Sequence, residues 1–569
     1  MHHWNTRYRY YSICILLFAF LSCNSKKHKK LSDDIITNPV AMNSKVADNI
    51  DEALTTILQN QGKTDDSIQL SMSKIVKEFY SRIDYKPIWS SSGKWLPLGD
   101  SLYQFISQAE NEGLFPEDYH FKKLKIIIDT LHADSVMRMN ALLWTRADIL
   151  LTDGFMQIIK DLKQGRLQPD SLSLNKDSLL VDKFFVASLN ELVEKKDING
   201  LFVSLQPVHK NYWELKKGIK RFVDSMDRRV FTHLSYPFKR GDAKDSLYFI
   251  KLLQKRLQES DCAEPGTGLP DSAQLLKAIK KYQAKTGLTT DGKYGKNLIN
   301  ALNSNDIEKF KRIAITLDRY KQLPEKMPAK YIWVNLPGFY LWMINADTVV
   351  FESKVICGKP ETRTPLLTSE ISDMVTYPTW TVPTSIIVKS YLPKLKNNPN
   401  YISKIGLKLL NNKGEVVDPN SINWSKYSRG IPFKIMQNSG DNNSLGVLKF
   451  NFNNPYAVYL HDTNQRYLFK NASRALSHGC VRVQEWEKLA YYIAANDSTL
   501  SRRKDSLRYT ADSIKNWIAK KERHRVDVIN HIPLYIRYFS CEGKNGVIKF
   551  YEDIYGEDKL LMEKYFAKK

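Results

Sequence analysis

Two short stretches near the C-terminus organise the chain: YLHDT at 459–463 and RALSHGCVRV at 474–483. The first alternates like a strand, which puts Tyr459 and His461 on one face. The second contains a Gly479–Cys480 turn and a short apolar run. An amphipathic helix is expected next, from its buried stripe of Trp486, Leu489, Ala490, Ile493 and Ala494. The sequence thus predicts strand, loop, short strand and helix, with Cys480 just before the helix.

Cys480 is the candidate nucleophile of this region. Nucleophilic catalysis needs a base to take the thiol proton and donors aimed at the developing oxyanion. His461 is the better base candidate, because it lies on a strand that faces the loop. Free backbone N–H groups at a helix start would favour a thiolate. The residues expected to serve as oxyanion donors or to position the substrate or the loop are His478, Gly479, Tyr459 and Arg482.

Two simpler interpretations compete with a nucleophilic site. A lone cysteine is often an inert buried residue, and a lone histidine is often structural. Alternatively, His461, His478 and Cys480 could hold zinc. No fourth ligand or general-base Glu stands at a familiar spacing, so a Cys–His nucleophile is favoured over a metal site.

The sequence Ser477-His478-Gly479-Cys480-Val481-Arg482 after an upstream His461 resembles the active-site signature of L,D-transpeptidases with the YkuD catalytic fold. The resemblance implies that Cys480 is the nucleophile and His461 the base. It implies attack on the third residue of a peptidoglycan stem peptide, release of the terminal D-alanine and a thioester acyl-enzyme. An amine of a neighbouring stem would resolve the thioester. No metal or organic cofactor is implied.

Length and charge limit the other possibilities. The chain has 569 residues, 43% of them hydrophobic, which suggests three or four domains. Lysine and arginine number 85 against 61 acidic residues, a net charge of +24. The basic residues are dispersed and no nucleic-acid motif is present, so we expect no nucleic-acid partner. An excess of positive charge also suits work beside anionic lipid or polymer.

The N-terminus is typical of export. Residues 1–22 combine early arginines with an apolar core shorter than the roughly 20 residues of a membrane span. Residues 21–23 resemble a bacterial lipoprotein cleavage site, with Cys23 as the lipidated residue and an uncleaved anchor as the alternative. Residues 23–66 are expected to be a polar tether. The remaining cysteines, Cys262, Cys357, Cys480 and Cys541, are too sparse for a disulfide framework.

The middle of the chain is expected to be helical. Residues 67–240 resemble the N-terminal scaffold of long L,D-transpeptidases and carry no catalytic pattern. Residues 245–303 predict three small helices and resemble a peptidoglycan-binding type 1 domain, with a non-binding spacer as the alternative. Residues 313–558 turn strand-rich and resemble the catalytic domain. Within them, residues 385–444 are polar and predict an inserted lid, although a disordered loop would look the same.

The sequence as a whole predicts an α+β multidomain protein: a helical scaffold, a three-helix unit and a mainly β YkuD-type domain with an inserted lid. We expect an exported enzyme, anchored to the membrane in the periplasm or cell envelope, that crosslinks peptidoglycan. Three alternatives stay open. The acyl-enzyme could be resolved by water, as in an L,D-carboxypeptidase, or by a protein amine or free D-amino acid. The chain could also be a wall-binding structural protein with a silent site.

Overall fold

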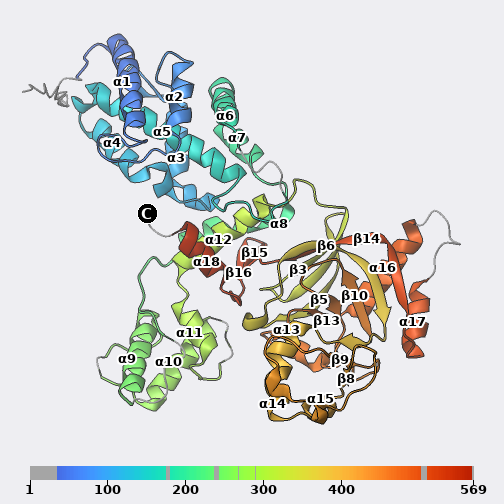
Figure 1. Cartoon of the computed structure of the whole chain (residues 1–569). Helices are drawn as coiled ribbons and strands as arrows, with labels where there is room; N and C mark the ends of the chain where they lie inside the picture. The colour runs from blue at the N-terminus through green and yellow to red at the C-terminus, as the bar shows by residue number, and fades with distance from the viewer. Residues whose placement is uncertain are drawn as a thin grey trace, which may run out of the picture.

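The computed structural model describes residues 35–174, 180–235, 243–266, 268–286, 288, 290–500 and 509–566 (Figure 1). The predicted signal peptide 1–22 and Cys23 lie outside the described residues. Among those described, no helix is long and apolar enough to cross a membrane. The four described cysteines are all free thiols.

The N-terminal third is a helical unit built around one buried helix, α5. Apolar residues occur on every side of α5, so it is buried around its whole circumference. Helix α5 (Ala141–Lys163) shares this core with α1 (Pro39–Gln59), α2 (Ser73–Ser81), α3 (Pro97–Ser107), α4 (Phe121–Ala133), α6 (Asp182–Lys195) and α7 (Ile198–Ser204). Two short strands, β1 (Ser90–Ser91) and β2 (Lys94–Trp95), pair beside them. The next helix, α8 (Lys210–Asp224), belongs to a different apolar cluster.

Helix α1 contradicts the predicted polar tether over residues 23–66. Asn38 caps α1 by accepting from Val40 N–H at 2.9 Å, and Pro39 starts the helix. One face of α1 packs on α5 through Met42, Val46, Ile50, Leu54 and Ile57. These residues recur at helical spacing, but polar residues separate them and hide the pattern. The described part of the tether therefore belongs to the scaffold core.

Three helices follow with a core of their own: α9 (Ala243–Glu259), α10 (Ser272–Lys285) and α11 (Lys296–Asn303). In Figure 1 they form a separate lobe below α12 (Asp306–Lys321). The expected three helices are therefore present. Whether they bind peptidoglycan stays a prediction.

The C-terminal half is built on a nine-stranded sheet whose order is β12-β5-β13-β11-β10-β6-β14-β3-β4. An additional β4–β5 pairing closes this sheet on itself around an apolar core. The strands are β3 (Lys330–Asn335), β4 (Tyr340–Asn345), β5 (Thr348–Gly358), β6 (Leu367–Thr376), β10 (Leu448–Phe452), β11 (Leu460–His461), β12 (Ala475–Ser477), β13 (Val481–Val483) and β14 (Arg525–Arg537). With the helical scaffold, this confirms the predicted α+β multidomain class.

The end of the chain ties the sheet to the scaffold. Helices α16 (Trp486–Leu500) and α17 (Ala511–Ala519) pack together beside the sheet. The hairpin of β15 (Cys541–Lys544) and β16 (Val547–Phe550) then packs on α8, and α18 (Glu557–Tyr565) packs on α12. Lys321 Nζ of α12 donates to the Asp161 carbonyl of α5 at 2.7 Å.

The predicted lid segment is folded, which overturns the alternative of a disordered loop. It contains α13 (Thr384–Ile386), a π-helical turn (Ile387–Tyr391), α14 (Leu392–Asn397), α15 (Tyr401–Lys404), β8 (Lys408–Leu410) and β9 (Lys434–Gln437). Strand β9 pairs with β8 and with β7 (Trp380–Thr381) in a small sheet. Buried side chains join it to the main core, among them Leu395, Ile402, Leu409, Trp424 and Ile435.

Candidate active site

The predicted nucleophile and base lie on adjacent parallel strands. Register pairs Leu460 of β11 with Val481 of β13, and His461 with Arg482. Residues directly opposite one another share a face of the sheet, and that face recurs at every second residue. Tyr459 and His461 on one strand therefore lie on the same face as Cys480 and Arg482 on the next. The structure brings these four sequence-predicted site residues together.

Hydrogen bonds fix the turn that presents Cys480. Gly479 has a φ of +123°, which favours glycine. Its N–H donates to Ser477 Oγ at 3.1 Å, and Ser477 Oγ donates to the Cys480 carbonyl at 2.6 Å. Thr364 Oγ1 donates to the Gly479 carbonyl at 2.7 Å. In this structure the Gly479 N–H is thus paired with Ser477 Oγ, and its expected oxyanion role stays a prediction.

One backbone donor remains at this turn. Within the described part of the chain, no acceptor pairs with the N–H of Cys480. This group is available to a ligand at the thiol, as an oxyanion donor must be.

Burial keeps His461 neutral. The side chain is 4% exposed, and burial lowers its pKa to about 3, with the positive charge of Arg482 as the second cause. Its Nδ1 makes no hydrogen bond of good geometry within the described residues, but the backbone of Asp462 and of Leu445 lies close to the ring and acts to raise the pKa. The neighbouring carboxylate of Asp462 does not orient the ring, since it accepts from Arg466 Nε and from Val447 N–H at 3.0 Å each. His461 is thus a neutral imidazole with proton-accepting capacity.

Burial also raises the pKa of the Cys480 thiol. The N–H and hydroxyl of Tyr459 and the charges of Lys449 and Arg482 act in the opposite direction, and burial outweighs them. The predicted thiolate at a helix start is therefore wrong: β13 separates Cys480 from α16, and the resting form is the thiol. Removal of the thiol proton by a base becomes a necessary step.

A residue missed in the sequence also lies on this face. Register on β10 pairs Lys449 with His461. Lys449 Nζ lies 4.0 Å from the centre of the Tyr459 ring, and no salt bridge joins it to an acidic residue in the described part of the chain. The sequence contained a signal for this position. Leu448, Phe450 and Phe452 alternate as buried residues, which predicts that Lys449 lies on the opposite face of the strand from the core.

His478 contacts the inserted segment. It is exposed, and its Nε2 lies 3.0 Å from Ser390 Oγ of the inserted segment. Burial lowers the pKa of His478, and the charges of Lys359, Arg482 and Lys394 lower it further. The positive φ of Gly479 interrupts the extended backbone between His478 and Cys480.

Arg482 contacts the loop after His461. Its guanidinium NH1 donates to Gln465 Oε1 at 3.1 Å, which agrees with the predicted steadying of a loop. Its Nε is buried without a partner in the described residues. Burial lowers the pKa of Arg482.

The zinc alternative finds no ligand set in the described ranges. No three His, Cys, Asp or Glu side chains gather there as metal ligands would.

Comparison with known families agrees with this geometry. Residues 329–500 match the family model of the L,D-transpeptidase catalytic domain, YkuD. The nine-stranded sheet as far as β13, the inserted segment and helix α16 fall within this match. Residues 74–219 match the Scaffold domain model, within the region expected to be a scaffold.

A relative described as "Putative L,D-transpeptidase" from Haemophilus influenzae is 30% identical over 327 residues. The match covers 57% of this chain and 63% of that relative. The similar solved structures include an L,D-transpeptidase from Mycobacterium smegmatis, 12% identical, covering 37% of this chain and 58% of that chain, with a TM-score of 0.17. One from Stackebrandtia nassauensis is 12% identical, covering 56% of this chain and all of that chain, with a TM-score of 0.16. TM-scores this low do not bear on the site.

Proposed function

We propose that the protein is an L,D-transpeptidase that crosslinks peptidoglycan stem peptides through a thioester on Cys480. The observation that carries this proposal is the placement of the Cys480 thiol and the neutral His461 imidazole on one face of two adjacent strands. The catalytic-domain match over residues 329–500 supports the same chemistry.

In the first half-reaction, Cys480 Sγ attacks the carbonyl carbon of the third residue of a donor stem. His461 accepts the thiol proton and returns it to the leaving amine, so the C–N bond breaks and D-alanine departs. The N–H of Cys480 is the backbone donor available to the oxyanion. An amine of a second stem then attacks the thioester, forms an amide and regenerates the thiol.

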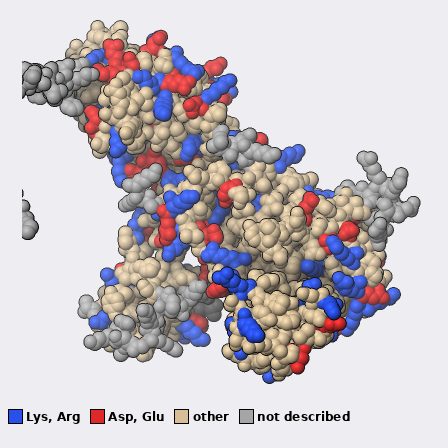
Figure 2. Space-filling view, viewed as in Figure 1, with Lys and Arg blue, Asp and Glu red and all other residues tan. Residues whose placement is uncertain are grey.

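Positive charge around the thiol suits a substrate with carboxylates. Lys449 and Arg482 share the face of Cys480, and Lys359 and Lys394 act on His478. Figure 2 shows Lys and Arg gathered near α13 and α14, mixed elsewhere with Asp and Glu. Stem peptides carry free carboxylates, so the cationic surroundings favour their binding.

The decisive test is mass spectrometry of the full chain incubated with purified tetrapeptide stems. We expect an acyl-enzyme on Cys480 with loss of D-alanine, followed by crosslinked dimers. If tripeptide is the sole product, water resolves the acyl-enzyme and the protein is a carboxypeptidase. If an added D-amino acid replaces the terminal D-alanine, the protein is an exchange transferase. Full biological activity of Cys480→Ala would instead support a structural wall protein.

The enzyme is further proposed to work outside the cytoplasm, held to the membrane through Cys23 or an uncleaved anchor. Helices α9–α11 would hold it on the wall polymer, and their separate core and lobe support a distinct role. Removing residues 245–303 should weaken sedimentation with isolated sacculi while turnover of small soluble stems persists. Unchanged sedimentation would make this unit a spacer.

A further inference from the structure

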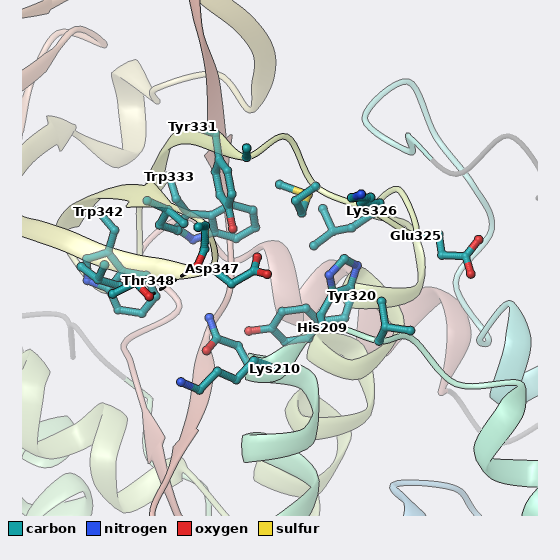
Figure 3. Close-up of a pocket in the computed structure, with 18 residues that line it drawn as sticks. His209, Lys210, Tyr320, Glu325, Lys326, Tyr331, Trp333, Trp342, Asp347 and Thr348 are labelled. Carbon is teal, nitrogen blue, oxygen red and sulfur yellow. Dashed lines mark hydrogen bonds between the residues drawn. The ribbon is translucent and has the colours of Figure 1, made fainter. Parts of the chain in front are cut away.

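A hollow that Cys480 does not line lies where segments distant in the sequence meet (Figure 3). The start of α8, the segment after α12, strands β3 and β4, and the β4–β5 turn with the first residues of β5 line a cavity of about 660 Å³. This volume is within the range of small-ligand sites. Because α8 belongs to the scaffold match and β3 and β4 to the catalytic match, an occupant would touch both units.

Aromatic rings form the floor and one wall of the hollow. Tyr320 and Trp333 are almost fully buried and make the floor, while Tyr331 and Trp342 are half-buried. Trp342 is held in place, since its ring stacks on Tyr340 with centroids 4.3 Å apart and its Nε1 donates to Glu352 Oε2 at 3.0 Å. The rings therefore offer rigid flat surfaces to a ligand.

Polar groups of both signs surround these rings. Lys210 and Lys326 are donors, and Glu325 and Asp347 are acceptors (Figure 3). Within the described residues, none of these four side chains has a hydrogen-bond or salt-bridge partner. The two carboxylates would repel a polyanion, even though two lysines lie beside them. A purely apolar ligand is disfavoured because it would leave these charged groups without partners. A neutral ligand with flat C–H faces and many hydroxyl or amide groups satisfies both features.

We propose that this hollow binds an N-acetylated sugar of the glycan strand that carries the stem peptides. This inference rests on the proposed function, which makes that glycan the available polymer. A pyranose ring would stack on Trp342 and Tyr331, and its hydroxyl and acetamido groups would bond to Lys210 and Asp347.

The test is calorimetric titration of the full chain with the N-acetylglucosamine tetramer. Trp342→Ala should weaken binding about tenfold, because a stacking surface is lost. Lys210→Ala should weaken it roughly threefold to tenfold, and its exposed position leaves the fold unaffected. Trp517→Ala is the matched control, since Trp517 stacks on His524 outside the hollow. It should bind the tetramer as the wild type does.

The absence of tetramer binding to the wild type would overturn the inference. So would binding that both Trp342→Ala and Lys210→Ala leave unchanged, which would place the sugar elsewhere, for example on α9–α11. Preference of the hollow for a free stem peptide over the tetramer would also overturn it. Acylation by a carbapenem, a β-lactam that the cysteine of L,D-transpeptidases typically attacks, is measured on the same samples. Failure of the proposed function is then seen separately as an unmodified Cys480.

Discussion

Two regions border Cys480, and they hold it in different ways. Strands β11 and β13 anchor the proposed nucleophile and base through sheet register and through fully buried neighbours such as Leu460 and Val481. The inserted segment approaches from another side, where Ser390 bonds to the exposed His478. The difference suggests that proton transfer depends on the sheet, whereas the insertion governs access and substrate contact.

The largest expected effect comes from the nucleophile on the sheet side. Cys480→Ala should abolish acylation by a carbapenem, since the other three thiols in the described part of the chain, Cys262, Cys357 and Cys541, are all buried. Cys541→Ala is the control: burial raises the pKa of Cys541 to about 12, so its thiol is inert. Intact-protein mass spectrometry measures both. A Cys480→Ala protein that still gains a carbapenem adduct would contradict the assignment.

Substitution of the two histidines tests the two regions separately, because His461 lies on the sheet and His478 contacts the insertion. His461→Ala should slow acylation roughly 10²–10⁴-fold, the usual range for losing a general base. His478→Ala should cost less, because the thiol, its base and the Cys480 N–H all remain. Stopped-flow acylation rates give the order. Greater damage from His478→Ala would mean that the base is on the insertion side.

The pH dependence sharpens the role of the buried pair. Because burial lowers the pKa of His461 to about 3, the base is neutral throughout the range from about pH 5 to 8. Burial lowers the pKa of His478 as well. The acylation rate should therefore change little across this range. It should rise at higher pH, as the thiol with its raised pKa begins to ionise.

A pH–rate profile of the wild type with a carbapenem tests this expectation. The opposite result is a rate that falls on acidification with a midpoint near pH 6.5, the ordinary value for histidine. That result would show that a solvated histidine supplies the base.

The smallest effect is expected in the insertion itself. If residues 390–440 close over bound substrate, their amide exchange should slow when Cys480 is acylated. Exchange in α5 serves as the control, since that helix is buried in the scaffold. Hydrogen exchange on free and acylated protein makes the measurement. Equal exchange in both states would argue against a closing lid.

Local patterns predicted the main features of the fold. The alternation at 459–461, the Gly479–Cys480 turn and the stripe that begins at Trp486 predicted strand, turn and helix in the correct order. Helix α1 was missed because polar residues dilute its apolar stripe. The missed pattern still lies in the sequence, since Met42, Val46 and Ile50 recur at helical spacing.

The sequence by itself was enough to identify Cys480 and His461 as candidate site residues, because the signature that contains them is a local pattern. Only the tertiary structure decided their state. The pKa of His461 depends on its burial and on the charge of Arg482, and the position of Lys449 depends on the β10–β11 register. The Gly479 N–H donates to Ser477 Oγ, a pairing that the local sequence did not predict. Burial and hydrogen-bond partners depend on segments that meet only after folding, and no period within one segment encodes them.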